Sequence, residues 1–155
     1  MGALVWHDLA RFISITASVY AVWSGFFGIF YRKFFWDFVG GTLRDPGGLQ
    51  PSPAASVFIM LIVKTPVIQI SAMIQGLLIL ALEFPIPVFK ALSVYRSFPM
   101  RIVLLFFQAF SCVLYYQGTN AALYSLIAIF CYTQALMRGE EMEEAKANRG
   151  KGGQA

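Results

Sequence analysis

The chain has 155 residues and a formal net charge of +4; 58% of its residues are hydrophobic and only 13% are charged. Typical soluble domains contain about 45–50% apolar and about 25% charged residues, so too few charges remain here to cover a water-exposed surface. The composition excludes a soluble globular enzyme, a disordered chain and a nucleic-acid-binding domain, and it indicates an integral membrane protein. One histidine and two cysteines are too few for an internal zinc or iron–sulfur site.

The first membrane helix is predicted over residues 12–31. This stretch carries no charge, and it is bounded by Arg11 on one side and by Arg32 and Lys33 on the other. Its length matches the ~20 residues that cross a hydrocarbon core. A cleaved signal peptide is the alternative, but the start lacks a basic region and an Ala-x-Ala cleavage site. We therefore expect the helix to be retained.

Small residues recur along this helix every four positions. Ala17, Ala21 and Gly25 form one stripe, and Gly28 lies beside it. Helices in membranes approach closely where such residues face each other. The stripe predicts either packing against the other helices of the chain or an intermolecular face for a partner helix.

A second apolar region follows a turn-rich loop. Residues 40–64 are interpreted as an interfacial or re-entrant segment, and the second span is predicted over residues 65–82. Lys64 and Pro66 interrupt the apolar sequence, which favours a break between a short helix and a span over one long tilted helix.

The last apolar region predicts a helical hairpin. No charged residue lies between Ile102 and Met137, and one straight helix of this length would reach about 54 Å, beyond a ~30 Å core. The polar residues 117–120 supply a turn between spans over 102–117 and 121–137. The expected fold is an all-α integral membrane protein with about four transmembrane helices in residues 1–138, followed by a flexible tail over 139–155.

Charge bias predicts the orientation of these spans. With four spans, both termini lie on one side together with the loop 83–101. That side carries Arg11, Lys90, Arg96, Arg101, Arg138, Lys146, Arg149 and Lys151. The other side carries Arg32, Lys33 and Arg44. The positive-inside rule therefore places both termini in the cytoplasm.

Candidate polar sites are few. Glu83 is the only acidic residue between Asp45 and Glu140, and a proton relay would need further acids or histidines in the spans. We therefore expect Glu83 to pair with Arg96 or Arg101. His7 is the only imidazole and is expected to be solvated at the membrane surface. No nucleophile–base arrangement appears, so an enzyme is not expected.

Transport is a weaker interpretation of the polar residues within the spans. It rests on scattered glutamines, which more often form hydrogen bonds between helices. These are Gln69, Gln75, Gln108 and Gln134.

Several short motifs suggest a relative. Trp6, then Arg32, Trp36 and Phe38, resemble the opening helix of a known family and its arginine–tryptophan exit. The sequence Leu82-Glu83-Phe84-Pro85 is similar to the Leu-Glu-Tyr-Pro of that family. Arg96 and Arg101, the hairpin after them and Arg138-Gly139-Glu140 align with it without a gap. On these residues the chain resembles the small (alpha) subunit of flavocytochrome b, the membrane partner of NADPH oxidases, and in particular its fungal counterparts.

The resemblance implies a non-catalytic membrane accessory subunit that binds and stabilises the catalytic subunit of an NADPH oxidase for superoxide production. It implies a location in the endoplasmic reticulum, and in the plasma membrane or vesicles, with haem and FAD in the partner and no cofactor in this chain. The proline-rich tail that binds an SH3 domain in the animal system is missing, so recruitment by that route is not expected.

The residues expected to contact the partner combine the small-residue stripe with the polar residues of the resemblance. They are Ala17, Ala21, Gly25, Gly28, Glu83, Arg96, Arg101, Arg138 and Glu140. The alternative function is a tetraspan structural protein that organises membrane without an oxidase partner.

Overall fold

The computed structural model describes residues 4–32, 53–84, 86–90, 92–142 and 146. These residues are predominantly helical and contain no strand, so the all-α expectation is confirmed. The helices in chain order are α1 (Trp6–Phe30), η2 (Pro53–Ala55), α2 (Ser56–Ile59), the π-helical η3 (Met60–Lys64), α3 (Val67–Glu83), α4 (Pro87–Lys90), η4 (Ser93–Arg96), α5 (Phe98–Val113), η5 (Tyr116–Gly118) and α6 (Thr119–Met137).

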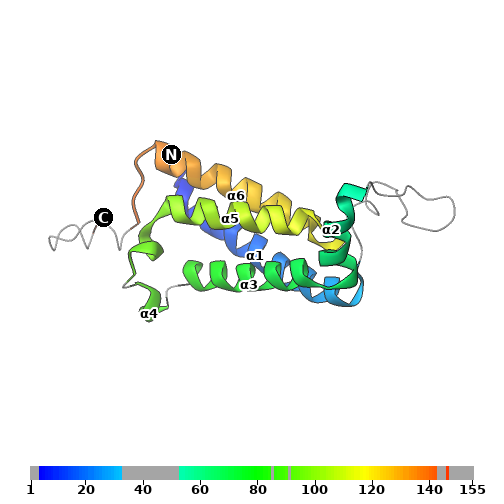
Figure 1. The fold of residues 1–155 in the computed structure, drawn as a ribbon. Helices are drawn as coiled ribbons and strands as arrows, with labels where there is room; N and C mark the ends of the chain where they lie inside the picture. Colours follow the sequence, from blue (N-terminus) through cyan, green and yellow to red (C-terminus); the bar gives the residue numbers. More distant parts are fainter. Residues whose placement is uncertain (1–3, 33–52, 85, 91, 143–145, 147–155) are drawn as a thin grey trace.

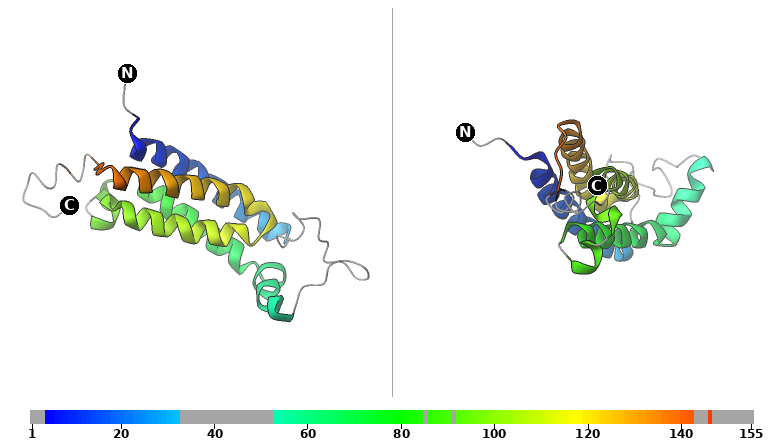
Figure 2. Two further views of the ribbon diagram at one scale, coloured as in Figure 1. Left: turned by 90° about the horizontal axis from the view of Figure 1, so that it is seen from above. Right: turned by 90° about the vertical axis from the view of Figure 1, so that its left-hand side faces the viewer.

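The four long helices form an antiparallel bundle. Helix α1 packs against α3 and α6, and α5 packs against the same two helices from the opposite corner. The start of α1, the end of α3, the start of α5 and the end of α6 lie together at one end of the bundle, which we call the termini end (Figures 1 and 2).

Two helical stretches of the described chain are long and apolar enough to cross a membrane alone. They are α1 and the continuous stretch Tyr116–Met137. Ser56–Lys64 and Val67–Glu83 qualify as a pair and would give a third span, although they are bent by 70° relative to each other. Helix α5 has 16 residues, fewer than the ~20 that usually span the hydrocarbon core.

The expected break beside Lys64 and Pro66 is confirmed. The π-helix η3 ends at Lys64, where the hydroxyl of Thr65 donates to the carbonyl of Met60 at 2.7 Å. Arg32, at the end of α1, donates from Nη1 to the Lys64 carbonyl at 2.9 Å. Residues 53–64 therefore project sideways from the bundle (Figure 2), whereas residues 40–52 lie outside the described chain.

The expected hairpin is also confirmed, with helix ends that differ from those predicted. Helix α5 starts at Phe98 rather than 102 because Ser97 caps it, accepting a hydrogen bond from the Met100 amide at 3.3 Å. It ends at Val113 rather than 117 because Tyr115 turns into the bundle and is fully buried. Gly118 closes the turn against the Cys112 carbonyl, where a side chain would collide.

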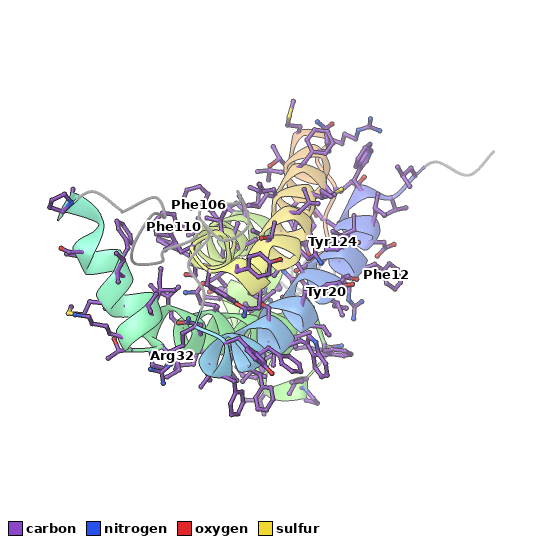
Figure 3. The ribbon with its side chains drawn as sticks, turned by 90° about the vertical axis from the view of Figure 1, so that its right-hand side faces the viewer. Phe12, Tyr20, Arg32, Phe106, Phe110 and Tyr124 are labelled. Atoms are coloured by element: carbon purple, nitrogen blue, oxygen red, sulfur yellow. The ribbon has the colours of Figure 1, made fainter. Side chains whose placement is uncertain are left out.

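Small and polar residues fill the bundle, and large apolar residues cover it. Ala17, Ala72, Ser18 and Ser125 have no exposed surface. The outer faces carry Phe12, Trp23, Phe30, Phe106, Phe110 and Phe130, each more than half exposed, some of which are labelled in Figure 3. A water-soluble bundle has the opposite distribution, whereas close packing through small residues is characteristic of helices in lipid.

Candidate functional site

A buried ion pair lies at the termini end of the bundle. Glu83 is the last residue of α3 and Arg101 stands in the first turn of α5, and they are 1% and 2% exposed. The Arg101 guanidinium donates from Nη1 to Oε2 of Glu83. The pairing expected for Glu83 is confirmed, and the structure selects Arg101. Arg96 lies in η4 and takes no part in this pair.

Most of the remaining polar atoms of the pair are also hydrogen-bonded; Arg101 Nε has no partner within the described residues. Arg101 Nη2 donates to the carbonyls of Leu82 at 3.0 Å and Tyr95 at 2.8 Å. The Tyr132 hydroxyl donates to Oε1 of Glu83 at 2.7 Å and accepts from Arg101 Nη1 at 3.1 Å. Buried charges are tolerated when they are paired and hydrogen-bonded in this way. Both carboxylate oxygens are occupied, so the arrangement suits the fastening of helices and not proton transfer.

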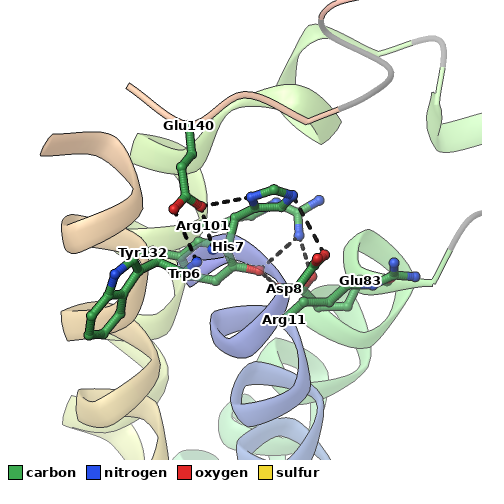
Figure 4. A network of polar contacts seen from close by, with 8 residues as sticks. All are labelled: Trp6, His7, Asp8, Arg11, Glu83, Arg101, Tyr132 and Glu140. Atoms are coloured by element: carbon green, nitrogen blue, oxygen red, sulfur yellow. Dashed lines mark hydrogen bonds and ion pairs between the residues drawn. The ribbon is translucent and has the colours of Figure 1, made fainter. Parts of the chain in front are cut away.

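Arg11 connects the first helix to this centre. Its Nε donates to the Glu83 backbone carbonyl at 3.0 Å, which is one of the carbonyls left without an intrahelical partner at the end of α3. Residues of α1, α3, α5 and α6 therefore meet around Glu83, with Arg11 on its backbone carbonyl and Arg101 and Tyr132 on its carboxylate (Figure 4).

Next to the ion pair, the two ends of the chain are joined by a contact that we call the clasp, formed by Trp6, His7, Arg138, Gly139 and Glu140. The Glu140 carboxylate accepts hydrogen bonds from the backbone amides of Trp6 at 3.1 Å and His7 at 2.9 Å, and it contacts His7 Nδ1 at 2.8 Å (Figure 4). The Arg138 guanidinium lies 5.1 Å from the centre of the Trp6 ring, within the range of a cation–π interaction.

The backbone around Gly139 directs Glu140 toward α1. Gly139 has φ +67°, a left-handed conformation that glycine adopts without a steric penalty. Its amide donates to the Leu136 carbonyl, and the Glu140 amide donates to the Ala135 carbonyl. These two bonds form a Schellman motif. They end α6 and turn the chain so that Glu140 reaches the start of α1.

Glu140 provides the cap that α1 lacks locally. The residue before α1 is Val5, whose side chain cannot accept a hydrogen bond from the first amides of the helix. A carboxylate at this position also interacts favourably with the positive end of the helix dipole. Partial burial alone would raise the pKa of Glu140, but the hydrogen bonds from His7 and Trp6 outweigh it and lower the pKa. The carboxylate is therefore ionised at neutral pH.

The structure corrects one expectation near the start of the chain. His7 is not freely solvated, because its side chain is 21% exposed and contacts Glu140. Gly139 and Glu140, the first residues of the predicted tail, form part of the clasp, and Met142 packs on the core. Residues 143–145 and 147–155 lie outside the described chain.

The small-residue stripe of α1 is enclosed by the rest of the chain. Ala17 and Ala21 have no exposed surface. A side chain at Gly25 would meet Met73 and lie 2.8 Å from the Gln69 carbonyl, and one at Gly28 would lie 2.8 Å from Gln69 Cγ. Of the two alternatives predicted for the stripe, the structure shows packing against other helices of the same chain. In this arrangement these four residues offer no face to a partner helix.

Gln108 and Gln75 form hydrogen bonds between the long helices. Gln108 donates to Ser125 Oγ at 2.9 Å, and its Oε1 accepts from Ser18 at 3.5 Å. Gln75 donates to Ser111 Oγ at 3.1 Å. These bonds join α1, α5 and α6 in one case and α3 and α5 in the other, so the glutamines named do not line a pore.

Sequence reasoning missed several residues of the site. Tyr132 is the second hydrogen-bond partner of the Glu83 carboxylate. Arg11 was expected only to bound the first span and to contribute to the charge bias, and its contact with Glu83 was not predicted. A hydroxyl within an apolar span was the available signal for Tyr132, because a buried hydroxyl usually has a hydrogen-bond partner. Within the described residues, no three His, Cys, Asp or Glu residues are grouped as a metal would require.

Residues 1–140 match the model of a family described as Domain of unknown function (DUF7727). The chain belongs to that family. Searches of curated proteins and of solved structures give no match. The matched region of the DUF7727 chain includes the four bundle helices, the buried ion pair and the clasp, so the whole candidate site lies within the family domain.

Proposed function

We propose that this protein is a non-catalytic membrane subunit that binds and stabilises the catalytic subunit of an NADPH oxidase. The proposal is supported by the positions, in the fold, of several residues on which the resemblance rests. Trp6, Glu83, Arg101 and Arg138-Gly139-Glu140 are spread over the sequence, yet they meet at the termini end in the ion pair and the clasp. Residues that resemble one family and also contact one another in the fold support the resemblance better than scattered similarities do.

The proposed mechanism is stabilisation by helix packing. Most polar groups of the site bond within the chain, and the outer faces of the bundle are largely apolar. Such a bundle can cover apolar surface of a larger membrane protein. It can also restrict the positions that the helices of that partner adopt, which stabilises the partner. Haem, FAD and the nicotinamide site would lie in the partner.

The proposed topology has four spans with both termini in the cytoplasm. Helix α5 reaches only about 24 Å, but its outward residues Val103, Phe106, Phe107, Phe110 and Val113 are apolar throughout. The described basic residues near the termini end are Arg11, Lys90, Arg96, Arg101, Arg138 and Lys146. Those near the opposite end are Arg32 and Lys64. The positive-inside rule supports a cytoplasmic termini end. The proposed location is the endoplasmic reticulum, and from there the plasma membrane or vesicles.

The test is purification of the tagged protein from its native membrane in a mild detergent, after crosslinking in the membrane to retain weak partners. The visible absorption spectrum is recorded and the co-eluting chains are identified. A haem Soret band that co-elutes with a larger flavoprotein supports the proposal. Haem-free material that contains this chain alone after crosslinking overturns it and favours the self-assembling tetraspan protein.

A further inference from the structure

Two tyrosines stack on the outside of the bundle where α1 and α6 lie side by side. The rings of Tyr20 and Tyr124 are 5.4 Å apart between centroids and inclined by only 8°. Tyr20 is 39% exposed, and Figure 3 shows both side chains at the surface of the bundle. We call this region the tyrosine face.

The tyrosine face lies near the middle of the proposed membrane. Along α1, Tyr20 is about 14 Å from Arg11 and about 18 Å from Arg32, the charged residues that bound the apolar stretch. The hydrocarbon core is about 30 Å thick, so the pair lies far from either water layer. Tyrosines of an interfacial aromatic belt would lie at the ends of the span.

Neither hydroxyl of the pair has a hydrogen-bond partner within the described residues. Other tyrosines of the bundle are satisfied: Tyr132 by Glu83 at 2.7 Å, and Tyr115 by Ser24 at 2.9 Å. An unpaired hydroxyl in an apolar medium is unfavourable, and lipid chains cannot supply a partner. The hydroxyls therefore require a hydrogen-bonding group from outside the described residues.

The surface beside the pair is open. A shallow depression of about 520 Å³ lies along α1, lined by Ile15, Thr16, Val19, Tyr20 and Trp23. The outer face of α5 differs in chemistry, because its exposed residues Val103, Phe106, Phe107 and Phe110 carry no polar group. Lipid tails suit the face of α5, whereas the tyrosine face suits a helix that can form hydrogen bonds.

We propose that the tyrosine face is the docking surface for one transmembrane helix of the catalytic subunit, and that this helix presents a hydrogen-bonding side chain at mid-depth. Serine, threonine, asparagine, glutamine and histidine are the residue types that join helices in this way. The inference rests on the proposed function and adds to it the surface and the chemistry of the contact.

The test is the double variant Tyr20→Phe with Tyr124→Phe, which removes both hydroxyl groups and keeps both rings. We expect the same helix content and thermal transition as the wild type. The loss of one hydrogen bond between membrane helices lowers the affinity roughly threefold. Loss of both bonds should therefore lower recovery of the partner, measured as Soret absorbance per tagged chain, about tenfold. Tyr31→Phe is the matched control, because Tyr31 is 61% exposed at the end of α1, where water can solvate its hydroxyl.

The outcomes separate the docking surface from the proposed function. If the wild type recovers a haem flavoprotein and the double variant recovers as much, the docking surface is wrong and the function stands. A photo-crosslinking residue at Leu123, exposed on α6 beside the pair, gives a second readout in native membranes. Crosslinks to the flavoprotein support the inference; crosslinks to a second copy or to lipid alone overturn it. A crosslink to a larger membrane protein without haem overturns the proposed function, but it still identifies the tyrosine face as a docking surface for a membrane protein.

Discussion

At the scale of single residues, the protein depends on one carboxylate buried at the end of α3. Glu83 is stable in that position only because Arg101 and Tyr132 occupy both of its oxygens. Removal of one partner from such a pair is more harmful than replacement of both, because the remaining charge stays buried without compensation. The pair is therefore a specific test of how the bundle is held together.

We expect Arg101→Met to destabilise the bundle by about 3–5 kcal/mol, because Glu83 is then buried without its counter-charge. Tyr132→Phe, which removes one hydrogen bond, should cost about 1–3 kcal/mol. The double variant Glu83→Met with Arg101→Met should be more stable than Arg101→Met alone. Unfolding of the detergent-solubilised protein measures all three. A double variant less stable than Arg101→Met would contradict the interpretation of the ion pair.

The clasp should respond to acid. Because the pKa of Glu140 is lowered in the folded protein, its contribution is complete above the ordinary glutamate pKa of about 4.3. The contribution is lost as the pH falls through the lower folded value. Fluorescence of Trp6, in a background with Trp23→Phe and Trp36→Phe, reports the clasp because Arg138 lies over its ring. We expect an acid transition in this background and none in the same background with Glu140→Gln; identical titrations would contradict the role of Glu140.

At the scale of helices, α1 and α3 approach each other because glycines remove side chains from both surfaces. Gly25 faces Met73 and the Gln69 carbonyl, and a side chain at Gly76 would lie 2.9 Å from the Ser18 carbonyl of α1. Most exposed residues of the same helices are large and apolar. The position of a residue around the helix therefore decides whether it is small or large.

We expect Gly25→Ala to destabilise the bundle by about 1–3 kcal/mol, since the added methyl group would overpack the contact with a backbone carbonyl that cannot move aside freely. Val19→Ala, which shortens a residue 53% exposed on the same helix, should change stability by much less. Thermal unfolding in one detergent compares the two variants. Equal effects would mean that α1 and α3 are not closely packed at Gly25.

At the scale of the whole molecule, the antiparallel bundle brings the start of α1 and the end of α6 to one end and the 114–118 turn to the other (Figure 1). Both free cysteines are buried inside the bundle. Single introduced cysteines can therefore report which side of a membrane each end faces.

We expect Ser93→Cys to react with a membrane-impermeant thiol reagent from the cytoplasmic side only, and Asn120→Cys to react only from the opposite side. Ser93 and Asn120 are both exposed and lie at opposite ends of the bundle. The wild-type chain is the control for Cys112 and Cys131, which should stay unlabelled. Labelling of both introduced cysteines from the same side would contradict the four-span topology.

The sequence by itself determined the helical fold, the break beside Lys64 and Pro66 and the hairpin between Ile102 and Met137. These features follow from local properties: apolar length, a proline without an amide hydrogen and a run of polar residues at a turn. Glu83 was identified as a candidate from its isolation in the sequence, and its pairing with a basic residue was expected for the same reason.

Only the tertiary structure decided which partners meet. Glu83 pairs with Arg101 and not with Arg96. The small-residue stripe at Ala17 and Gly25 faces the inside of the bundle. Glu140 accepts a hydrogen bond from the amide of His7, 133 residues away in the chain. Residue type and spacing indicate which groups a side chain can bind. Which distant segments come into contact depends on how the helices pack. Small residues permit close approach to any helix that fits, so the bundle had to be seen before their neighbour was known.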